Sequence, residues 1–266
     1  MRRLVIGLLV LVAVLVAIDY GAAAVTESAV SREMREQIGL PDDPSVRING
    51  FPFLTQALSG HFRSVDVKAE RVALGPLRQL EVRAELRDVT APMSTLLGSG
   101  PRTLRIGRVD GDLRIHPNDL ERLMPGVRRL RVEPIDRNTL RELVKEGGST
   151  SLLAIDTAHA ARLVGTITMA GKETEVFVIA ALELRNGEAV VLPRDIRIGD
   201  ADAPPVPASV QGFIEEMFAI RVNPGSLPLT ATPTSLHAVD GVLEVSGSVE
   251  DLVLGESGGV TTADSR

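Results

Sequence analysis

The chain has 266 residues, 44% of them apolar and 24% charged, and its formal net charge is −6. This composition is typical of a globular protein, and the negative charge argues against a general affinity for nucleic acid, whose phosphates are bound by clustered Lys and Arg. The sequence contains no cysteine, which excludes disulfides and thiolate metal sites. Aromatic residues make up only 3%, so any cavity would be lined by aliphatic side chains, which suit acyl chains better than nucleobases or sugars.

Residues 1–24 have the features of an export signal. Two arginines precede fifteen uncharged apolar residues, Leu4 to Ile18, and the Ala22-x-Ala24 pattern fits cleavage after Ala24. A retained membrane anchor is the alternative, and Asp19 is an unusual charge between an apolar run and a cleavage site. Both alternatives place the rest of the chain in the periplasm or at the outer face of the plasma membrane.

The pattern after residue 24 predicts one helix followed by many strands. Helical spacing of apolar residues predicts an amphipathic helix over 25–39, with Thr26 as its N-cap and Gly39 as its stop. From Val46 onward most segments alternate polar and apolar residues, and a slip of phase before Val72 indicates a bulge. Strands are expected near 65–74, 80–86, 104–115, 127–133, 162–170, 174–184, 189–198 and 242–253.

Helices and turns interrupt this pattern at a few places. Short helices are expected within 116–124, within 136–148 with Asp136 as a cap, and within 207–220. The Asn-Gly pair in the segment 185–188 predicts a two-residue hairpin. The fold class is therefore α+β with a predominantly antiparallel sheet, as a single domain over 25–254 followed by a disordered tail over 255–266.

Two segments offer apolar side chains for a binding site. The strand over 174–184 is apolar on both faces, and its Phe177 and Ile179 face either a core or an interior cavity. The helix within 207–220 gathers Phe213 and Met217 on one apolar side. We expect these four residues to contact lipid.

Charged residues indicate a headgroup site more than a catalytic one. Residues 101–145 contain 11 basic and 7 acidic residues, with Arg128, Arg129 and Arg131 the densest group. These arginines are candidates for headgroup phosphate, although a solvated surface is the alternative. Asp110 and Asp112 have the spacing of a metal-binding Asp-x-Asp pair, but Asp-Gly is also ordinary turn chemistry. No metal site or cofactor is expected.

The segment "NGFPFLTQALSGHF", residues 49–62, concentrates the rings of a ring-poor chain. Pro52 restricts both its own backbone and that of Phe51, and Leu54, Ala57 and Leu58 suggest one helical turn closed by Gly60. Such a corner either lines the mouth of a cavity or plugs the end of a core. We expect lipid contact by a set of motif residues, namely Phe51, Pro52, Phe53, Leu54 and Phe62.

This motif and the strands that follow it resemble the LmeA-like phospholipid-binding proteins of the actinobacterial cell envelope. The resemblance rests on Gly50 to Gln56, on the alternating segments over 65–86, and on the order of signal, short helix, motif and β-rich body. It implies an envelope protein that binds anionic phospholipids and supports the maturation of lipoglycans, lipomannan in particular. It also implies a curved sheet wrapped around a helix and enclosing an apolar cavity, as in tubular lipid-binding proteins.

The sequence thus supports a non-enzymatic lipid-binding or lipid-transfer protein whose partners are anionic phospholipids and the membrane surface. Two alternatives remain open. One is a metal-dependent envelope enzyme of glycolipid metabolism that uses Asp110 and Asp112, and the other is an anchored scaffold for a biosynthetic complex.

Overall fold

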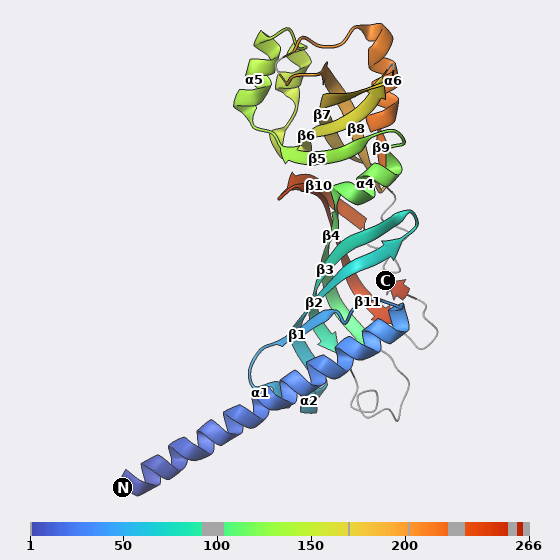
Figure 1. The fold of residues 1–266 in the computed structure, drawn as a ribbon. Helices are drawn as coiled ribbons and strands as arrows, with labels where there is room; N and C mark the ends of the chain where they lie inside the picture. The colour runs from blue at the N-terminus through green and yellow to red at the C-terminus, as the bar shows by residue number, and fades with distance from the viewer. Residues whose placement is uncertain are drawn as a thin grey trace. The chain divides into compact units, whose positions relative to one another are not determined.

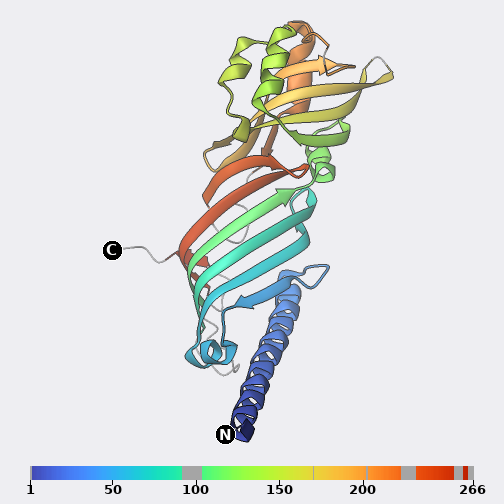
Figure 2. The ribbon, with the colours of Figure 1, turned by 90° about the vertical axis from the view of Figure 1, so that its left-hand side faces the viewer.

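The computed structural model describes residues 2–91, 104–169, 171–201, 203–222, 232–254 and 260–262. The chain is α+β, and its strands form two antiparallel sheets (Figure 1). The first has the order β1-β2-β3-β4-β11-β10 with β12 beside β11, and the second has the order β5-β6-β7-β8-β9. Figure 2 shows that the strands of the first sheet curve strongly, as the predicted fold class requires.

The first half of the chain contains three helices and five strands among its described residues. They are α1 (Arg2–Ile38), β1 (Ser45–Asn49), α2 (Phe53–Ser59), β2 (His61–Leu74), β3 (Leu77–Thr90), β4 (Leu104–Ile115), α4 (Pro117–Leu123) and β5 (Arg128–Pro134). The second half contains α5 (Arg137–Lys145), the 3-10 turns η1 (Thr150–Ala154) and η2 (Thr157–His159), β6 (Ala160–Met169), β7 (Lys172–Arg185), β8 (Glu188–Ile198), α6 (Ala208–Phe218), β9 (Ile220–Val222), β10 (Thr232–Val239), β11 (Val242–Leu254) and β12 (Val260–Thr262).

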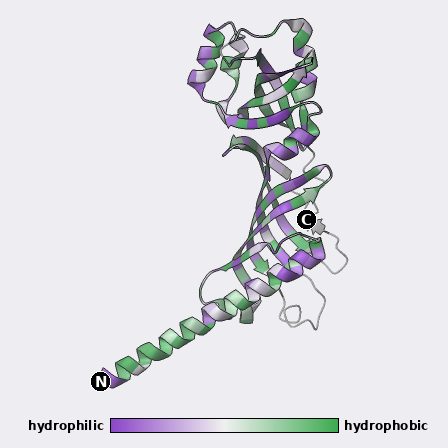
Figure 3. Cartoon of the chain, in the orientation of Figure 1, coloured by the Kyte–Doolittle hydropathy of each residue, from purple (hydrophilic) through white to green (hydrophobic). Residues whose placement is uncertain are grey.

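Helix α1 contains two segments that were predicted from the sequence as separate elements. The predicted export signal and the predicted amphipathic helix form one continuous helix of 37 residues, whose first part is strongly apolar (Figure 3). The prediction that Thr26 caps a helix is wrong, because Thr26 lies inside α1 and its hydroxyl donates to the carbonyl of Ala22 at 2.9 Å. Gly39 ends the helix as predicted, with a left-handed φ of 73°.

Local turn chemistry accounts for several other elements. Asn186 and Gly187 both have positive φ, as the predicted two-residue hairpin between β7 and β8 requires. The side chain of Asp136 accepts a hydrogen bond from the backbone of Thr139 at 2.7 Å and so caps α5. Arg71 has a φ of 56° at the point where the alternation along β2 slips.

The chain divides into two compact units. Unit 1 contains residues 1–70, 82–111 and 248–266, and unit 2 contains residues 71–81 and 112–247. The division passes through the first sheet, so that unit 1 holds β1, α1, α2 and part of β2, β3, β4 and β11, whereas unit 2 holds the whole second sheet. Within the segment predicted to be a tail, residues 260–262 form β12.

The second sheet is the core of unit 2. On β7, Val176, Val178 and Ala180 are fully buried, and Ile179 and Leu182 are nearly so, so both faces of this strand are covered as its sequence predicted. On β6, Gly165 lies against Phe218 of α6, because a Cβ atom there would come within 3.3 Å of the ring. Helix α5 contributes Leu140 and Leu143 to a cluster with Leu152 and Ile179.

Candidate functional site

The ring-rich motif folds into a corner at the end of unit 1. Pro52 precedes α2, and Gly60 ends it with a left-handed φ of 67°. The side chains of Phe53 and Phe62 are each only 5% exposed, and their ring centroids lie 6.3 Å apart. These two rings belong to the core, which corresponds to the plug alternative for that half of the motif.

Asp19 of α1 holds this corner. Its carboxylate accepts hydrogen bonds from the backbone N–H groups of Phe53 and Leu54, each at 2.8 Å. The N-cap residue Pro52 makes no side-chain cap, so Asp19 supplies from another helix the acceptor that an N-cap residue normally provides. Although it is an acid on an otherwise apolar helix face, Asp19 is 6% exposed.

The other side of the corner is an exposed apolar surface. Phe51 is 54% exposed and its ring stacks on that of Tyr20, with centroids 6.0 Å apart. Leu54 and Leu58 lie one helical turn apart on α2 and are 38% and 70% exposed. We call Tyr20, Phe51, Leu54 and Leu58 the apolar corner.

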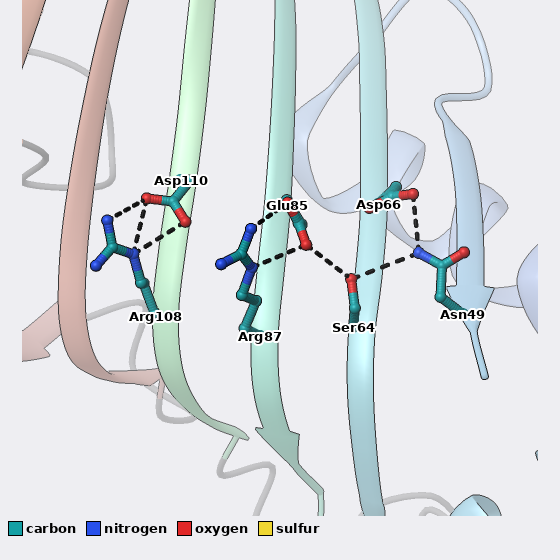
Figure 4. Close-up of polar contacts among 7 residues, drawn as sticks. All are labelled: Asn49, Ser64, Asp66, Glu85, Arg87, Arg108 and Asp110. Carbon is teal, nitrogen blue, oxygen red and sulfur yellow. Dashed lines mark hydrogen bonds and ion pairs between the residues drawn. The ribbon is translucent and has the colours of Figure 1, made fainter.

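One face of the curved sheet in unit 1 is polar (Figure 4). Ser64 of β2 donates to Glu85 of β3, and Glu85 accepts from Arg87 at 2.8 Å. On β4, Arg108 contacts Asp110 at 2.9 Å and Glu250 of β11 at 3.3 Å. The Arg87 side chain, which donates to Glu85, lowers the pKa of that carboxyl.

The opposite face of the same strands is aliphatic. Because neighbouring residues of a strand point to opposite faces, Val65 and Val67 lie behind the polar row on β2, and Ala84 and Leu86 lie behind it on β3. The register of β1 on β2 places Ile48 on this face beside Val65. We call this set the aliphatic face: Val46, Ile48, Val65, Val67, Ala69, Val82, Ala84, Leu86, Val109 and Val249.

Much of the aliphatic face is only partly covered by protein. Val65, Val67, Val82, Ala84 and Leu86 are all half-buried, unlike the fully buried residues of β7. The sequence showed the alternation of these strands, but we predicted no site residue from it. The aliphatic composition was the signal that could have found this face, since rings are too few to line a site in this chain.

Phe177 and Ile179, the predicted lipid contacts on β7, line a small pocket with charged walls. Phe177 and Ile179 line a pocket of about 150 Å³ in unit 2, together with Arg162, Asp195 and Arg197. This volume is below the roughly 300 Å³ of a typical small-molecule pocket. Several of its walls are charged, so it is unlike the aliphatic cavity that the resemblance implied.

Arg197 is the most buried of these charges. Its side chain is 1% exposed and donates to Asp195 and Glu146, each at 2.9 Å, and to the carbonyl of Leu143 at 2.8 Å. The paired charges and the backbone bond satisfy the guanidinium inside the protein. We therefore interpret this cluster as a structural link between β8 and the end of α5.

The remaining predicted site residues also lie in unit 2. Phe213 of α6 is exposed, whereas Met217 is half-buried and its Cε lies 2.8 Å from the position of a Cβ at Gly126. The motif residues are together in unit 1, and Phe177, Ile179, Phe213 and Met217 are in unit 2.

The three candidate headgroup arginines are exposed on β5. Arg129 contacts Glu173 at 2.7 Å and Arg131 contacts Glu175 at 2.9 Å, both on β7. The hydrogen bond from Arg129 lowers the pKa of Glu173. A lipid phosphate would have to replace these carboxylates, so headgroup binding by the trio stays a prediction.

Asp110, one of the two carboxylates of the enzyme alternative, is engaged in another contact. Both carboxylate oxygens of Asp110 accept from Arg108 at 2.9 Å. Across the described ranges, no group of three or more His, Asp and Glu side chains is arranged to hold a metal ion. His159 and His237, far apart in sequence, do lie side by side with ring centroids 5.0 Å apart.

A comparison with protein families gives one match, to a family described as LmeA-like phospholipid-binding, over residues 17–248. The match begins within α1, two residues before Asp19, and it includes the corner and the curved sheet as far as the middle of β11. No curated protein and no solved structure matches the chain.

Proposed function

Because the chain belongs to the LmeA-like phospholipid-binding family, we propose that it is an exported phospholipid-binding protein that holds acyl chains on the aliphatic face of unit 1. The observation that carries this proposal is the half-buried row of aliphatic side chains behind a row of polar and charged ones. A row of half-buried aliphatic side chains offers an apolar ligand a surface to pack on.

The chemistry of the face suits an acyl chain. Each methylene group removed from water contributes about 0.8 kcal/mol, so a lipid chain that buries about ten of them gains roughly 8 kcal/mol before the costs of binding. Valine, leucine and alanine side chains offer such a chain a surface without hydrogen-bonding groups. The polar face keeps the other side of the sheet in water.

The finer assignments follow from the same proposal. The protein would act in the periplasm, at the outer face of the plasma membrane, and would support the maturation of lipoglycans such as lipomannan. Its lipids would be anionic, with Arg128, Arg129 and Arg131 as candidate headgroup contacts. Helix α1 supports export, because it is long and apolar enough to cross a membrane.

The test compares two double variants on neighbouring positions of the same strands. Val67→Ser with Leu86→Ser makes the aliphatic face polar, and Asp66→Ser with Arg87→Ser changes the opposite face. We expect the first pair to lower the phospholipid recovered per folded protein by about tenfold or more, since the loss of two buried aliphatic contacts is worth at least about 1.4 kcal/mol. The second pair should retain the lipid of the unchanged protein.

Phospholipid would be extracted from protein purified from its native envelope and quantified by mass spectrometry. Circular dichroism would establish that each variant is folded. Equal lipid loading in the two pairs, or no phospholipid in the unchanged protein, would contradict the proposal.

A further inference from the structure

We propose that α1 is retained in the mature protein and that the apolar corner inserts into the outer leaflet of a phospholipid bilayer, at the boundary between headgroups and acyl chains. This inference concerns how the protein is seated on the membrane, and it does not depend on the aliphatic face holding a lipid.

The first argument is that cleavage after Ala24 would remove contacts between α1 and the motif. Cleavage after Ala24 would separate Asp19 from the backbone N–H groups of Phe53 and Leu54, and Tyr20 from the ring of Phe51. The start of α2 would then lack its acceptor. A disposable signal peptide needs no such contacts with the mature domain, whereas a permanent anchor that positions the domain does.

The second argument is the charge of Asp19. A carboxylate next to an apolar run is costly in a membrane unless it is partnered. Here the two N–H groups of α2 satisfy it, and its side chain is 6% exposed. Asp19 can therefore lie at the membrane boundary, and it brings α2 to the same level.

The third argument is length. The fifteen residues from Leu4 to Ile18 extend about 22 Å at 1.5 Å per residue, which is about 8 Å shorter than a hydrocarbon core of roughly 30 Å. Because Arg2 and Arg3 favour the inner boundary, the outer boundary lies beyond Ile18, near the turn of α1 that carries Asp19 and Tyr20. The apolar corner is fixed to that turn and therefore lies in the interfacial layer of the membrane.

The fourth argument is that the surface at this level is apolar. Outside α1, only five large apolar side chains of the described residues are strongly exposed, and three of them are Phe51, Leu54 and Leu58. Tyr20 joins them directly to the exposed apolar side of α1. Aromatic and aliphatic side chains on a surface continuous with a membrane span are suited to the interface.

The absence of cysteine makes the test direct. Single substitutions Leu58→Cys and, as a control on β4 of the same unit, Arg105→Cys would be labelled with an environment-sensitive fluorophore. Both positions are exposed, so neither change should disturb the fold. Phe213→Cys controls for exposed apolar character alone. The full chain would be reconstituted in vesicles of phosphatidylcholine and phosphatidylglycerol.

We expect the label at residue 58 to be quenched by lipids that carry a nitroxide near the headgroup. It should also be at least about threefold less accessible to aqueous iodide than the label at residue 105, since interfacial groups lie ~5–10 Å inside the boundary. Asp19→Ala in the Leu58→Cys chain should reduce this protection. Intact mass spectrometry of the protein from its native membrane should find residues 1–24 present.

Three results would overturn the inference. They are a mature mass that lacks residues 1–24, equal iodide access at residues 58 and 105, and protection from iodide without lipid quenching, which would mean that a protein covers the corner. Lipid extraction from the same samples separates this outcome from the proposed function, because loss of seating with normal lipid loading contradicts only the inference.

Discussion

The two sheets differ in how completely their apolar side chains are buried. In unit 2, β7 is covered on both faces, and even the charged side chain of Arg197 is enclosed and paired. In unit 1, one face of the sheet carries exposed ion pairs and the other leaves valines and leucines half-buried. A closed core leaves no apolar surface for a ligand, whereas the half-covered aliphatic face does, and we propose this face as the lipid site. Unit 2 therefore has the closed core, and unit 1 contains the candidate site.

The largest expected effect comes from breaking the closed unit. Arg197→Ala leaves Asp195 buried without its partner and should lower the free energy of unfolding of unit 2 by about 3–5 kcal/mol. Arg108→Ala in the exposed row of unit 1 should cost only about 0–1 kcal/mol, since solvent screens surface pairs. Amide hydrogen exchange, measured separately for β7 and for β3, would check both values. Equal losses of unfolding free energy in the two units would contradict the difference between the closed core of unit 2 and the exposed ion pairs of unit 1.

A smaller effect separates the two halves of the ring-rich motif. Phe53→Ala removes a 5% exposed ring from the core of unit 1 and should cost about 3 kcal/mol. Phe51→Ala removes a ring that is 54% exposed and should cost no more than about 1 kcal/mol of stability. Urea unfolding would measure both. If Phe51→Ala were the more destabilising change, the apolar corner would be part of the core.

The smallest expected effect is on the stability of the protein at acidic pH. The pKa of Glu85, lowered by its hydrogen bond from Arg87, lies below its ordinary value of 4.5 in the folded protein. This stabilisation is therefore present above pH 4.5 and is lost as the pH falls through the lowered pKa. The melting temperature should drop below pH 4.5, and Glu85→Gln should make that drop smaller. An identical pH profile in the variant would mean that Glu85 does not contribute.

The sequence predicted the strands well because their signals are local. Alternation places β4 and β7 close to their observed bounds, and Asn186-Gly187 sets the hairpin after β7. The curved antiparallel α+β fold was also correctly expected. The short strand β9 and strand β10 carried too little periodic signal to be predicted.

The site was harder to predict because its contacts are distant in sequence. Asp19 caps a helix that begins 34 residues later, and no local pattern reports such a pairing. The motif was singled out from the sequence, and in the structure its rings divide between the core and the surface. Which of the predicted residues contact lipid stays a prediction.

Glu27 of helix α1 binds the backbone of the strand at one edge of the first sheet. Strand β1 is at the edge of the first sheet, and the N–H of Ile48 points away from β2, where it donates to the carboxylate of Glu27 at 2.7 Å. An open strand edge is a template on which another chain can add a strand, and such addition leads to aggregation. A charged helix that occupies this edge blocks that route. The β1 edge of the first sheet is thus protected from the addition of a strand by another chain.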